Sequence, residues 1–349
     1  MFIYWAIFVV LATGALLSQE PRPGLTRFLL FALGALPTAL MIGFRWKIGP
    51  DWIAYDRIYK YSALLSFSQN LARDDPGFKI LSWGLQQFHA PFWTLNAVSG
   101  LVFVAGLAAF CLRQPNPWLA YLLAFPYLVI VVAMSGDRQS IALGLLFFSL
   151  NAFERGHLYR FALCIFAAGL FHGSALLMLP ICLLSHTKNR VQRLLLLLVF
   201  ALLAVHFFED TFSIYARRYS RESIQSTGVA YRLAMNSLAA LIFLVFERRF
   251  ALDQSQSRLW RNISLCTLGL IPLLAFVPSS TAIDRFLLYL FPLQFVVLGR
   301  LPKALFEDRQ MRGLLTFFVI AYAASVQATF LFLGSFSQYY VPYHSILDR

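Results

Sequence analysis

Long apolar runs recur from one end of the chain to the other, and they constrain its fold more than any other feature. Several of them reach about 20 residues, the length that an α-helix needs to cross the hydrocarbon core of a bilayer. Only 13% of the residues are charged, about half the share that soluble domains carry. These features predict an all-α polytopic membrane protein whose main partner is the lipid bilayer.

We expect about 11–12 transmembrane helices, some short or re-entrant, in a single integral membrane domain over residues 1–349. The run 158–184 is too long for one simple span, and Phe171-His172-Gly173-Ser174 interrupts it. It is therefore predicted to form two short helices that meet at His172, either as a re-entrant hairpin or as two short crossings. The predicted spans are 1–17, 26–44, 92–112, 118–134, 136–153, 158–184, 191–208, 229–246, 262–277, 284–299 and 313–333.

The basic residues are distributed as topology signals. The net charge is +13, but Lys and Arg punctuate the apolar runs instead of forming one stripe, which argues against a nucleic-acid partner. Their bias between the loops favours both termini outside. The four cysteines lie in or beside apolar runs, and the six histidines show no helical ligand spacing, so neither a metal nor another cofactor is expected.

Two external loops, residues 45–91 and 209–229, are longer than the topology requires. Charges alternate with Trp, Tyr and Phe in the first loop, and Pro and Gly interrupt it. Its aromatic content argues against disorder. We expect this loop to form interfacial helices, with its aromatic residues at the level of the lipid headgroups.

An acid and an arginine, Asp137 and Arg138, lie between the apolar runs 118–133 and 141–153. An ionisable pair within a membrane is costly and indicates a functional site. Ser135 is expected to cap the second run as a helix, which places Arg138 in its first turn. The positive end of the helix dipole and its unpaired N–H groups suit an anion there, above all phosphate. In the structural alternative, Asp137 simply neutralises Arg138 at the interface.

Other polar residues are predicted at the same external face. Asp284 and Arg285 are expected to begin the helix 284–299, with residues 279–281 as candidate caps, and His172 lies at the outward break. Several arginines and two helix N-termini around one cavity would bind a diphosphate well, because Arg forks match phosphate oxygens. The further members of this set are Arg45, Asp51, Tyr55, Arg217, Arg218 and Arg232.

Each member of this set also has a structural interpretation. An arginine near a span end can extend to the interface, and neighbouring loop arginines can simply be solvated. A polar residue can pack at a turn, and an acid can cap a helix and neutralise its neighbour. The first alternative applies to Arg45 and Arg232, and the second to Arg217 and Arg218. Asp51 and His172 can be turn residues, and Tyr55 can be an interface anchor. The last alternative applies to Asp284 beside Arg285.

Six short motifs follow one another along the chain. They are Arg45…Gly49-Pro50-Asp51…Tyr55, Asp75-Pro76-Gly77-Phe78, Arg138-Gln139-x-Ile141-Ala142, Phe171-His172-x-Ser174-Ala175, Asp284-Arg285-Phe286…Tyr289 and Pro342-Tyr343-x-Ser345-Ile346-Leu347. In this order and spacing the chain resembles the EpsG family of Wzy-type polysaccharide polymerases over about residues 40 to 349. No motif covers residues 1–25 or 247–261.

The resemblance implies a bacterial inner-membrane glycosyltransferase of the O-antigen, capsule or exopolysaccharide type, with a GT-C-like architecture. Such enzymes take oligosaccharide repeat units linked to undecaprenyl diphosphate at the periplasmic face. They transfer the growing glycan to the non-reducing end of the next unit, without a nucleotide sugar or a metal. A chain-length regulator is a candidate partner. A glycan ligase, a transporter of lipid-linked sugars and an acyltransferase that modifies sugars remain alternative functions.

Residue roles follow as a hypothesis. Arg138 and Arg285 would bind the diphosphate and stabilise its departure, and His172 or Asp51 would act as general base. Trp52 and Tyr55 would form an aromatic platform for sugar rings. The remaining substrate-binding candidates are Arg45, Asp75, Asp137, Arg217, Arg218, Arg232, Asp284, Tyr289 and Tyr343.

Overall fold

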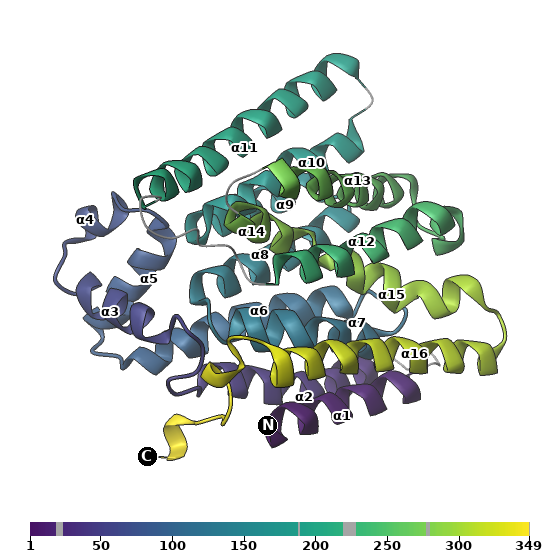
Figure 1. Cartoon of the computed structure of the whole chain (residues 1–349), viewed down its shortest axis with the longest axis horizontal. Helices are drawn as coiled ribbons and strands as arrows, with labels where there is room; N and C mark the ends of the chain where they lie inside the picture. Colours follow the sequence, from purple (N-terminus) through teal and green to yellow (C-terminus); the bar gives the residue numbers. More distant parts are fainter. Residues whose placement is uncertain (19–23, 188, 219–227, 277–279, 349) are drawn as a thin grey trace. The chain divides into compact units, whose positions relative to one another are not determined.

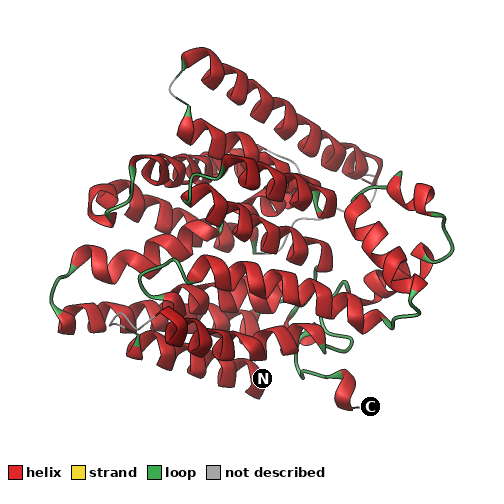
Figure 2. Ribbon diagram, turned by 180° about the vertical axis from the view of Figure 1, so that it is seen from behind, coloured by secondary structure: helices red, strands yellow, loops and turns green. Residues whose placement is uncertain are grey.

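The computed structural model describes residues 1–18, 24–187, 189–218, 228–276 and 280–348. Helices dominate this part of the chain, and no strand occurs in it (Figure 2). Four of the described helices are long and apolar enough to cross a membrane, or five if one bent pair counts as a single span. The chain is therefore an all-α polytopic membrane protein, as predicted.

The helices lie where the apolar runs predict them. Each of the eleven predicted spans contains at least one helix. Four of the apolar helices, however, have only 10–17 residues, which is short for a simple crossing. The expected total of about 11–12 transmembrane helices therefore stays a prediction.

The chain divides into two compact units, and each is described by itself. The first unit comprises Met1–His172 and Phe306–Arg349. Whether the two units form the expected single domain stays a prediction. The helices of the first unit are α1 (Phe2–Leu17), α2 (Gly24–Gly43), α3 (Trp52–Ser62), α4 (Phe67–Leu71), α5 (Pro76–Gln87), α6 (Phe92–Cys111), α7 (Pro117–Ala124) with the π-helix η1 (Phe125–Ala133), α8 (Asp137–Glu154), α9 (Leu158–Phe171) and α16 (Arg309–Ala328) with the π-helix η4 (Thr329–Leu333), before the short 3-10 turns η5 (Ser337–Tyr339) and η6 (Ile346–Asp348) (Figure 1).

Close packing of small residues fixes α8 in the first unit. A Cβ on Gly106 of α6 would lie 2.2 Å from the carbonyl oxygen of Gly144 of α8, so only glycine allows this approach. On another face of α6, a Cβ on Gly100 would lie 2.8 Å from Ile42 of α2. Small residues at helix interfaces are the usual way in which membrane helices approach closely. The start of α8 is thus held beside the end of α2.

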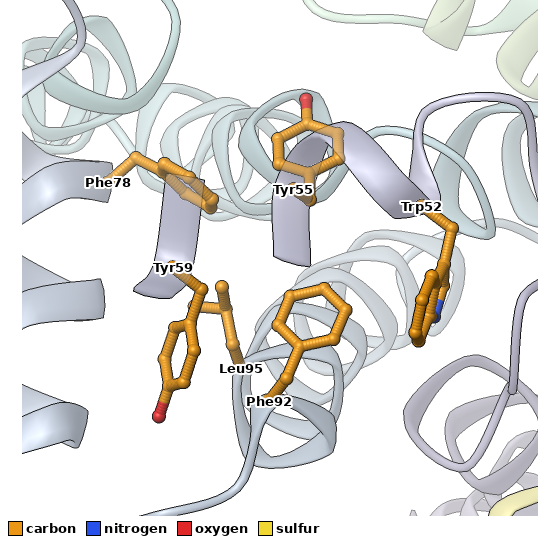
Figure 3. Close-up of a cluster of buried hydrophobic side chains, with 6 residues drawn as sticks. All are labelled: Trp52, Tyr55, Tyr59, Phe78, Phe92 and Leu95. Carbon is orange, nitrogen blue, oxygen red and sulfur yellow. The ribbon is translucent and has the colours of Figure 1, made fainter. Parts of the chain in front are cut away.

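The first long loop is helical, as predicted, and comprises α3, α4 and α5. Four of its aromatic side chains, Trp52, Tyr55, Tyr59 and Phe78, are buried against the start of α6 in a cluster with Phe92 and Leu95 (Figure 3). The rings lie mostly edge to face, for example Tyr55 against Phe78 at 5.4 Å between centroids. This apolar cluster makes the loop an ordered part of the first unit. Its position relative to a membrane stays a prediction.

The C-terminal segment forms backbone hydrogen bonds with the chain that follows α2. The backbone N–H of Trp46 donates to the carbonyl of His344, and that of Ile346 donates to Phe44, both at 2.9 Å. Gly49, whose φ is +89°, donates to Tyr339 at 2.9 Å. A Cβ on Gly49 would lie 2.7 Å from the carbonyl of residue 134, so this turn lies directly against the start of α8.

The second unit comprises Gly173–Leu305. Its first 3-10 helix begins directly after His172, whose backbone is extended (φ −155°, ψ 107°), so the predicted break at this residue is confirmed. Whether the break makes a re-entrant hairpin stays a prediction. The helices are η2 (Gly173–Leu177), α10 (Met178–His186), α11 (Arg190–Arg218), α12 (Val229–Phe246), η3 (Glu247–Phe250), α13 (Gln254–Phe276), α14 (Ser280–Leu290) and α15 (Pro292–Leu305).

A bend of 44° separates α14 from α15, where Pro292 prevents the helix from continuing. The side-chain amide of Asn236 in α12 donates to the carbonyl of Leu290 at 3.3 Å. A carbonyl at the break thus keeps a hydrogen-bond partner, which matters because unpaired backbone groups are costly in lipid.

Candidate functional site

Residues 134–136 turn the chain from η1 into α8, and Gly136 is the N-cap residue. The expected cap by Ser135 is wrong, because its hydroxyl instead donates to Oδ2 of Asp51 at 3.0 Å. This bond connects the start of α8 to the start of α3, where Asp51 is the N-cap residue. Arg138 lies in the first turn of α8, as predicted.

The guanidinium of Arg138 is held by two side chains from the first long loop. Its Nη1 donates to Oδ2 of Asp75 at 2.5 Å, and its Nε donates to the hydroxyl of Tyr55 at 3.3 Å. It also lies 5.6 Å from the centroid of the Tyr55 ring, which favours a cation. Its Nη2 has no hydrogen bond to a described residue, and the side chain is 32% exposed. This edge of the guanidinium is therefore available to an anion.

The partner of Arg138 reaches it through an unusual backbone conformation. Asp75 is the N-cap residue of α5 and has φ +52°, in the left-handed region that aspartate tolerates better than most residues. Pro76 follows as the first residue of the helix, where its missing N–H costs nothing. The Asp-Pro-Gly sequence at the start of α5 thus fixes the carboxylate that orients Arg138.

Asp137 does not neutralise Arg138, so that alternative is wrong. Its Oδ1 accepts a hydrogen bond from Nη2 of Arg45 at 2.7 Å, and the two side chains are 0% and 1% exposed. Arg45 also donates from Nη1 to the carbonyl of Ile42 at 2.8 Å. The arginine is thus enclosed, and the alternative that it extends to the interface is wrong as well. A role of this pair in substrate binding stays a prediction.

The aromatic cluster contacts the Arg138 site through Tyr55. The Tyr55 hydroxyl points away from the other labelled rings in Figure 3, while the ring itself packs among them. Burial raises the pKa of Tyr55, so the phenol is neutral and accepts the hydrogen bond from Arg138. Trp52 is buried in the same cluster. The expected platform for sugar rings would need these rings to be accessible, and it stays a prediction.

His172 lies at the same end of the α8–α9 hairpin as Arg138. The two helices are antiparallel neighbours joined by a turn with Gly156 at φ +76°, so the start of α8 and the end of α9 meet at one end. A Cβ on Gly77 of α5 would lie 3.0 Å from Leu170, which places the end of α9 against the start of α5. His172 itself is 9% exposed.

Tyr343 belongs to the C-terminal segment and contacts the end of α2. Its hydroxyl donates to the carbonyl of Met41 at 2.9 Å. Burial raises its pKa to about 12. Tyr343 therefore lies near Arg45, and its hydrogen bond holds the C-terminal segment against the backbone of α2. Its predicted contact with substrate stays a prediction.

In the second unit, Arg232 of α12 and Asp284 of α14 form a bidentate ion pair. Nε and Nη2 of the arginine donate to the two carboxylate oxygens at 2.7 and 2.8 Å. The alternative that Asp284 neutralises Arg285 is therefore wrong. The expected helix start is wrong too, because α14 begins at Ser280 and places Asp284 in its second turn.

Arg285 is exposed and makes no hydrogen bond or ion pair with any residue in the described ranges. Tyr289, one turn later, is fully buried. Because α14 begins at Ser280, the argument from a helix N-terminus does not apply to Arg285. Residue 279 and the side chains of Arg217 and Arg218 lie outside the described part of the chain.

Sequence reasoning missed Lys79, which lies one turn after Asp75 on the same face of α5. It is 6% exposed. Burial, together with the charges of Arg73 and Arg138, lowers its pKa to about 8. The available signal was a lysine between the apolar residues Phe78 and Ile80.

The structure therefore assembles part of the predicted set. Within the first unit it brings Asp51, Tyr55, Asp75 and Arg138 together, beside the enclosed pair of Arg45 and Asp137 and on the same side as His172. Within the second unit it joins Arg232 to Asp284. The expected convergence of all these residues around one cavity stays a prediction. Among the described residues, no three His, Cys, Asp or Glu side chains form a group that could hold a metal ion.

One family model, described as the EpsG family, matches residues 28–345, nearly the whole chain. The match includes every predicted site residue, from Arg45 to Tyr343. No curated protein and no solved structure matches the chain.

Proposed function

The chain belongs to the EpsG family, and from this premise we propose that it polymerises undecaprenyl-diphosphate-linked oligosaccharide repeat units at the periplasmic face of the bacterial inner membrane. Family membership supports a polysaccharide-polymerase-like role in general, and the long apolar helices make the chain a membrane protein. The donor, the acceptor and the face of the membrane are the parts that we propose.

The proposed reaction transfers a glycan from one lipid diphosphate to another molecule of lipid-linked repeat unit. A hydroxyl oxygen at the non-reducing end of the acceptor unit attacks the anomeric carbon of the donor glycan. The bond from that carbon to the diphosphate oxygen breaks, and its electron pair leaves with undecaprenyl diphosphate. The acceptor proton passes to a general base. The step therefore needs stabilisation of the departing diphosphate and a proton acceptor at the opposite side.

The observation that supports the proposal most directly is the geometry of Arg138. This arginine lies in the first turn of α8, where the helix dipole and unpaired N–H groups favour an anion. Asp75 and Tyr55 hold its guanidinium in one orientation and leave Nη2 available. A pre-oriented arginine of this kind stabilises developing negative charge without reorganisation, and removing one such donor typically costs a factor of about 10²–10³ in kcat.

The general base is His172 or Asp51. His172 lies at the same end of its helical hairpin as Arg138, and imidazole accepts a proton near neutral pH without tuning. Asp51 already accepts a hydrogen bond from Ser135, which suits a residue that orients the acceptor hydroxyl. Arg285 is exposed, and its predicted contact with the diphosphate stays a prediction. The variants His172→Gln and Asp51→Asn distinguish the two candidates. Only loss of the general base removes the acidic limb of the pH–rate profile, where protonation of the base slows the reaction.

The test uses the purified full chain in detergent with an undecaprenyl-diphosphate-linked oligosaccharide, with EDTA present, followed by gel separation of the products. We expect a ladder of lengthening lipid-linked glycans from the unaltered protein and none from Arg138→Ala. A single new product on a different lipid or protein acceptor would instead support a glycan ligase. Unchanged substrate with the host's own repeat unit would support a transporter.

Arg113→Ala is the matched control. This arginine is 28% exposed and pairs with Glu154 at 2.7 Å, at the opposite end of α8 from Arg138. Arg113 itself follows α6, so the same substitution removes an arginine that pairs with the opposite end of α8. A polymer ladder that survives Arg113→Ala and disappears with Arg138→Ala would place the effect at the start of α8. Equal loss in both variants would contradict the proposed role of Arg138.

A further inference from the structure

A buried lysine without a counter-ion lies beside the Arg138 site. Lys79 is 6% exposed, and its Nζ makes no hydrogen bond or ion pair with any residue that the structure describes. Its Nζ lies 5.7 Å from the centroid of the Phe78 ring. A buried charge is costly unless an opposite charge and hydrogen bonds accompany it. The fold therefore maintains an ammonium group whose natural partner is an anion.

Two arginines and two acids act on the charge of Lys79, and the arginines have the larger effect. Arg138 of α8 and Arg73, from the turn before α5, both act on it, while Asp74 and Asp75 oppose them. The Asp75 carboxylate already accepts the hydrogen bond of Arg138. Asp75 is also four residues before Lys79, so both side chains lie on one helix face. Side chains of a helix incline toward its N-terminus, which directs Lys79 toward the Arg138 end of α5.

Arg73 provides an independent second observation. Its Nη1 is buried and has no hydrogen-bond partner among the described residues. Its guanidinium lies 5.1 Å from the centroid of the Tyr61 ring, which positions it on α3 without satisfying that nitrogen. Unsatisfied buried donors are rare in folded proteins and call for an explanation. Two cationic side chains that act on one another both have unused donors here.

We infer that Lys79 and Arg73 form a second phosphate subsite beside Arg138, so that one phosphate of a diphosphate binds at Arg138 and the other at Lys79 and Arg73. Phosphate oxygens would supply the hydrogen-bond acceptors and the negative charge that both side chains lack. This inference rests on the proposed function for the identity of the ligand as a polyprenyl diphosphate. It adds to that function a residue pair that distinguishes a diphosphate from a monophosphate, because the second phosphate needs its own cation.

The test measures diphosphate binding to the full chain in detergent by calorimetry, with inorganic pyrophosphate and farnesyl diphosphate as the two probes. We expect Lys79→Met to raise the Kd of both probes about tenfold to a hundredfold, as for a charge-assisted hydrogen bond in a buried site. Inorganic phosphate should lose much less affinity, because it occupies the Arg138 side alone. Methionine preserves most of the side-chain volume and the apolar contacts.

Lys60→Met is the matched control for this substitution. Lys60 lies on α3, is 70% exposed and pairs with Asp56, so its loss should leave the Kd of all probes unchanged. Thermal unfolding provides the second readout. Removal of an unpaired buried ammonium should leave the melting temperature of Lys79→Met unchanged or raise it, whereas a purely structural lysine would lower it.

Two results would overturn the inference: pyrophosphate and farnesyl diphosphate both bind Lys79→Met as tightly as the unaltered chain, or neither probe binds the unaltered chain. Its failure is distinguishable from failure of the proposed function. If Lys79→Met weakens diphosphate binding but no lipid-linked substrate gives a polymer ladder, the subsite stands and the polymerase proposal fails. If Arg138→Ala abolishes the ladder while Lys79→Met changes neither affinity nor ladder, the polymerase proposal stands and the subsite fails.

Discussion

Two ion pairs start from adjacent residues of α8 and differ in almost every other respect. The pair of Asp137 with Arg45 is fully enclosed, at 0% and 1% exposure. The pair of Arg138 with Asp75 is 32% and 16% exposed and shares its arginine with a tyrosine hydroxyl. The first pair connects the start of α8 to the end of α2. The second connects it to the helices of the first long loop and leaves one edge of the guanidinium open.

The two pairs have different roles: the enclosed pair stabilises the fold, and the open pair presents a charge to a ligand. Arg45 Nε and Asp137 Oδ2 are buried without a hydrogen-bond partner among the described residues, so this pair bears a desolvation cost that its one hydrogen bond offsets only in part. Arg138 keeps contact with solvent and has donors to spare. An enclosed pair with no free approach can position neighbouring groups, whereas the open pair can meet a ligand.

The largest expected effect is on the enclosed pair. Asp137→Asn removes the counter-charge of buried Arg45, and breaking such a pair typically costs about 3–5 kcal/mol. We expect the free energy of unfolding, measured by SDS denaturation in mixed micelles, to fall by about this amount. The double variant Arg45→Met with Asp137→Leu should recover most of the loss, because it buries no unpaired charge. A double variant as unstable as Asp137→Asn would show that the pair itself holds the two helices together.

The same substitution at the open pair should act on activity instead of stability. Asp75→Asn leaves Arg138 without its orienting carboxylate, so we expect the rate of polymer formation to fall about tenfold to a hundredfold, as for loss of an orienting partner. The free energy of unfolding should change by less than about 1 kcal/mol, as for a partly exposed ion pair. Comparable losses of stability in Asp75→Asn and Asp137→Asn would remove the distinction between the two pairs.

The pH dependence of diphosphate binding tests whether Lys79, beside the open pair, binds the anion. The pKa of Lys79 is lowered from 10.5 to about 8 by burial and by Arg73 and Arg138, with Asp74 and Asp75 opposing. Lys79 is therefore protonated below about pH 8 and loses its proton above it, while the arginines stay charged. Because the bound anion needs the ammonium, affinity for pyrophosphate should fall about tenfold per pH unit above that pKa.

This group affects stability with the opposite sign. Its folded-state pKa lies below the unfolded value, so it disfavours folding at pH values below about 8, and that penalty disappears as the pH rises toward 10.5. Calorimetric binding and thermal unfolding across this range provide the two measurements. In Lys79→Met, both the affinity for pyrophosphate and the melting temperature should lose the pH dependence that comes from Lys79. Ionisation of pyrophosphate itself affects both proteins equally, so it cancels in the comparison. Identical pH profiles in the two proteins would contradict the assignment.

The smallest effect is expected at an exposed ion pair of the same loop. Lys60 and Asp56 of α3 lie four residues apart, 2.7 Å from Nζ to Oδ2, with the lysine 70% exposed. Pairs of this type contribute about 0.3–0.5 kcal/mol. Asp56→Asn should therefore lower the free energy of unfolding by no more than this and leave polymer formation unchanged. A loss of more than about 1 kcal/mol would mean that exposure alone does not separate the pairs.

Much of the fold was predictable because bilayer thickness and helix geometry leave few options. The eleven apolar runs each contain a helix, and Phe171-His172-Gly173-Ser174 marks the end of α9 correctly. The start of α14 was misplaced by four residues, because the polar Ser280 and Thr281 extend that helix beyond its apolar part. Hydropathy locates the apolar portion of a helix, and its polar first turn carries no such signal.

The site was only partly predictable. Arg138, Asp75, Tyr55 and Asp51 were selected from the sequence, and the structure brings them together. Lys79 was missed because one lysine in an amphipathic helix is usually solvated. Its burial depends on α5 packing against α3 and against the end of α9, contacts between segments far apart in the chain. No local pattern reports them.

The sequence by itself determined that the chain is an all-α membrane protein, where its helices lie and that an acid and an arginine meet at the start of α8. Only the tertiary structure decided which charges pair. Neighbouring helical residues point about 100° apart, so Asp137 and Arg138 do not face one another, and neither do Asp284 and Arg285. Three of these four residues instead pair with an opposite charge elsewhere in the chain: Arg45, Asp75 and Arg232. Burial makes such a partner necessary for Asp137, and the packing of distant segments supplies the partner in all three pairs.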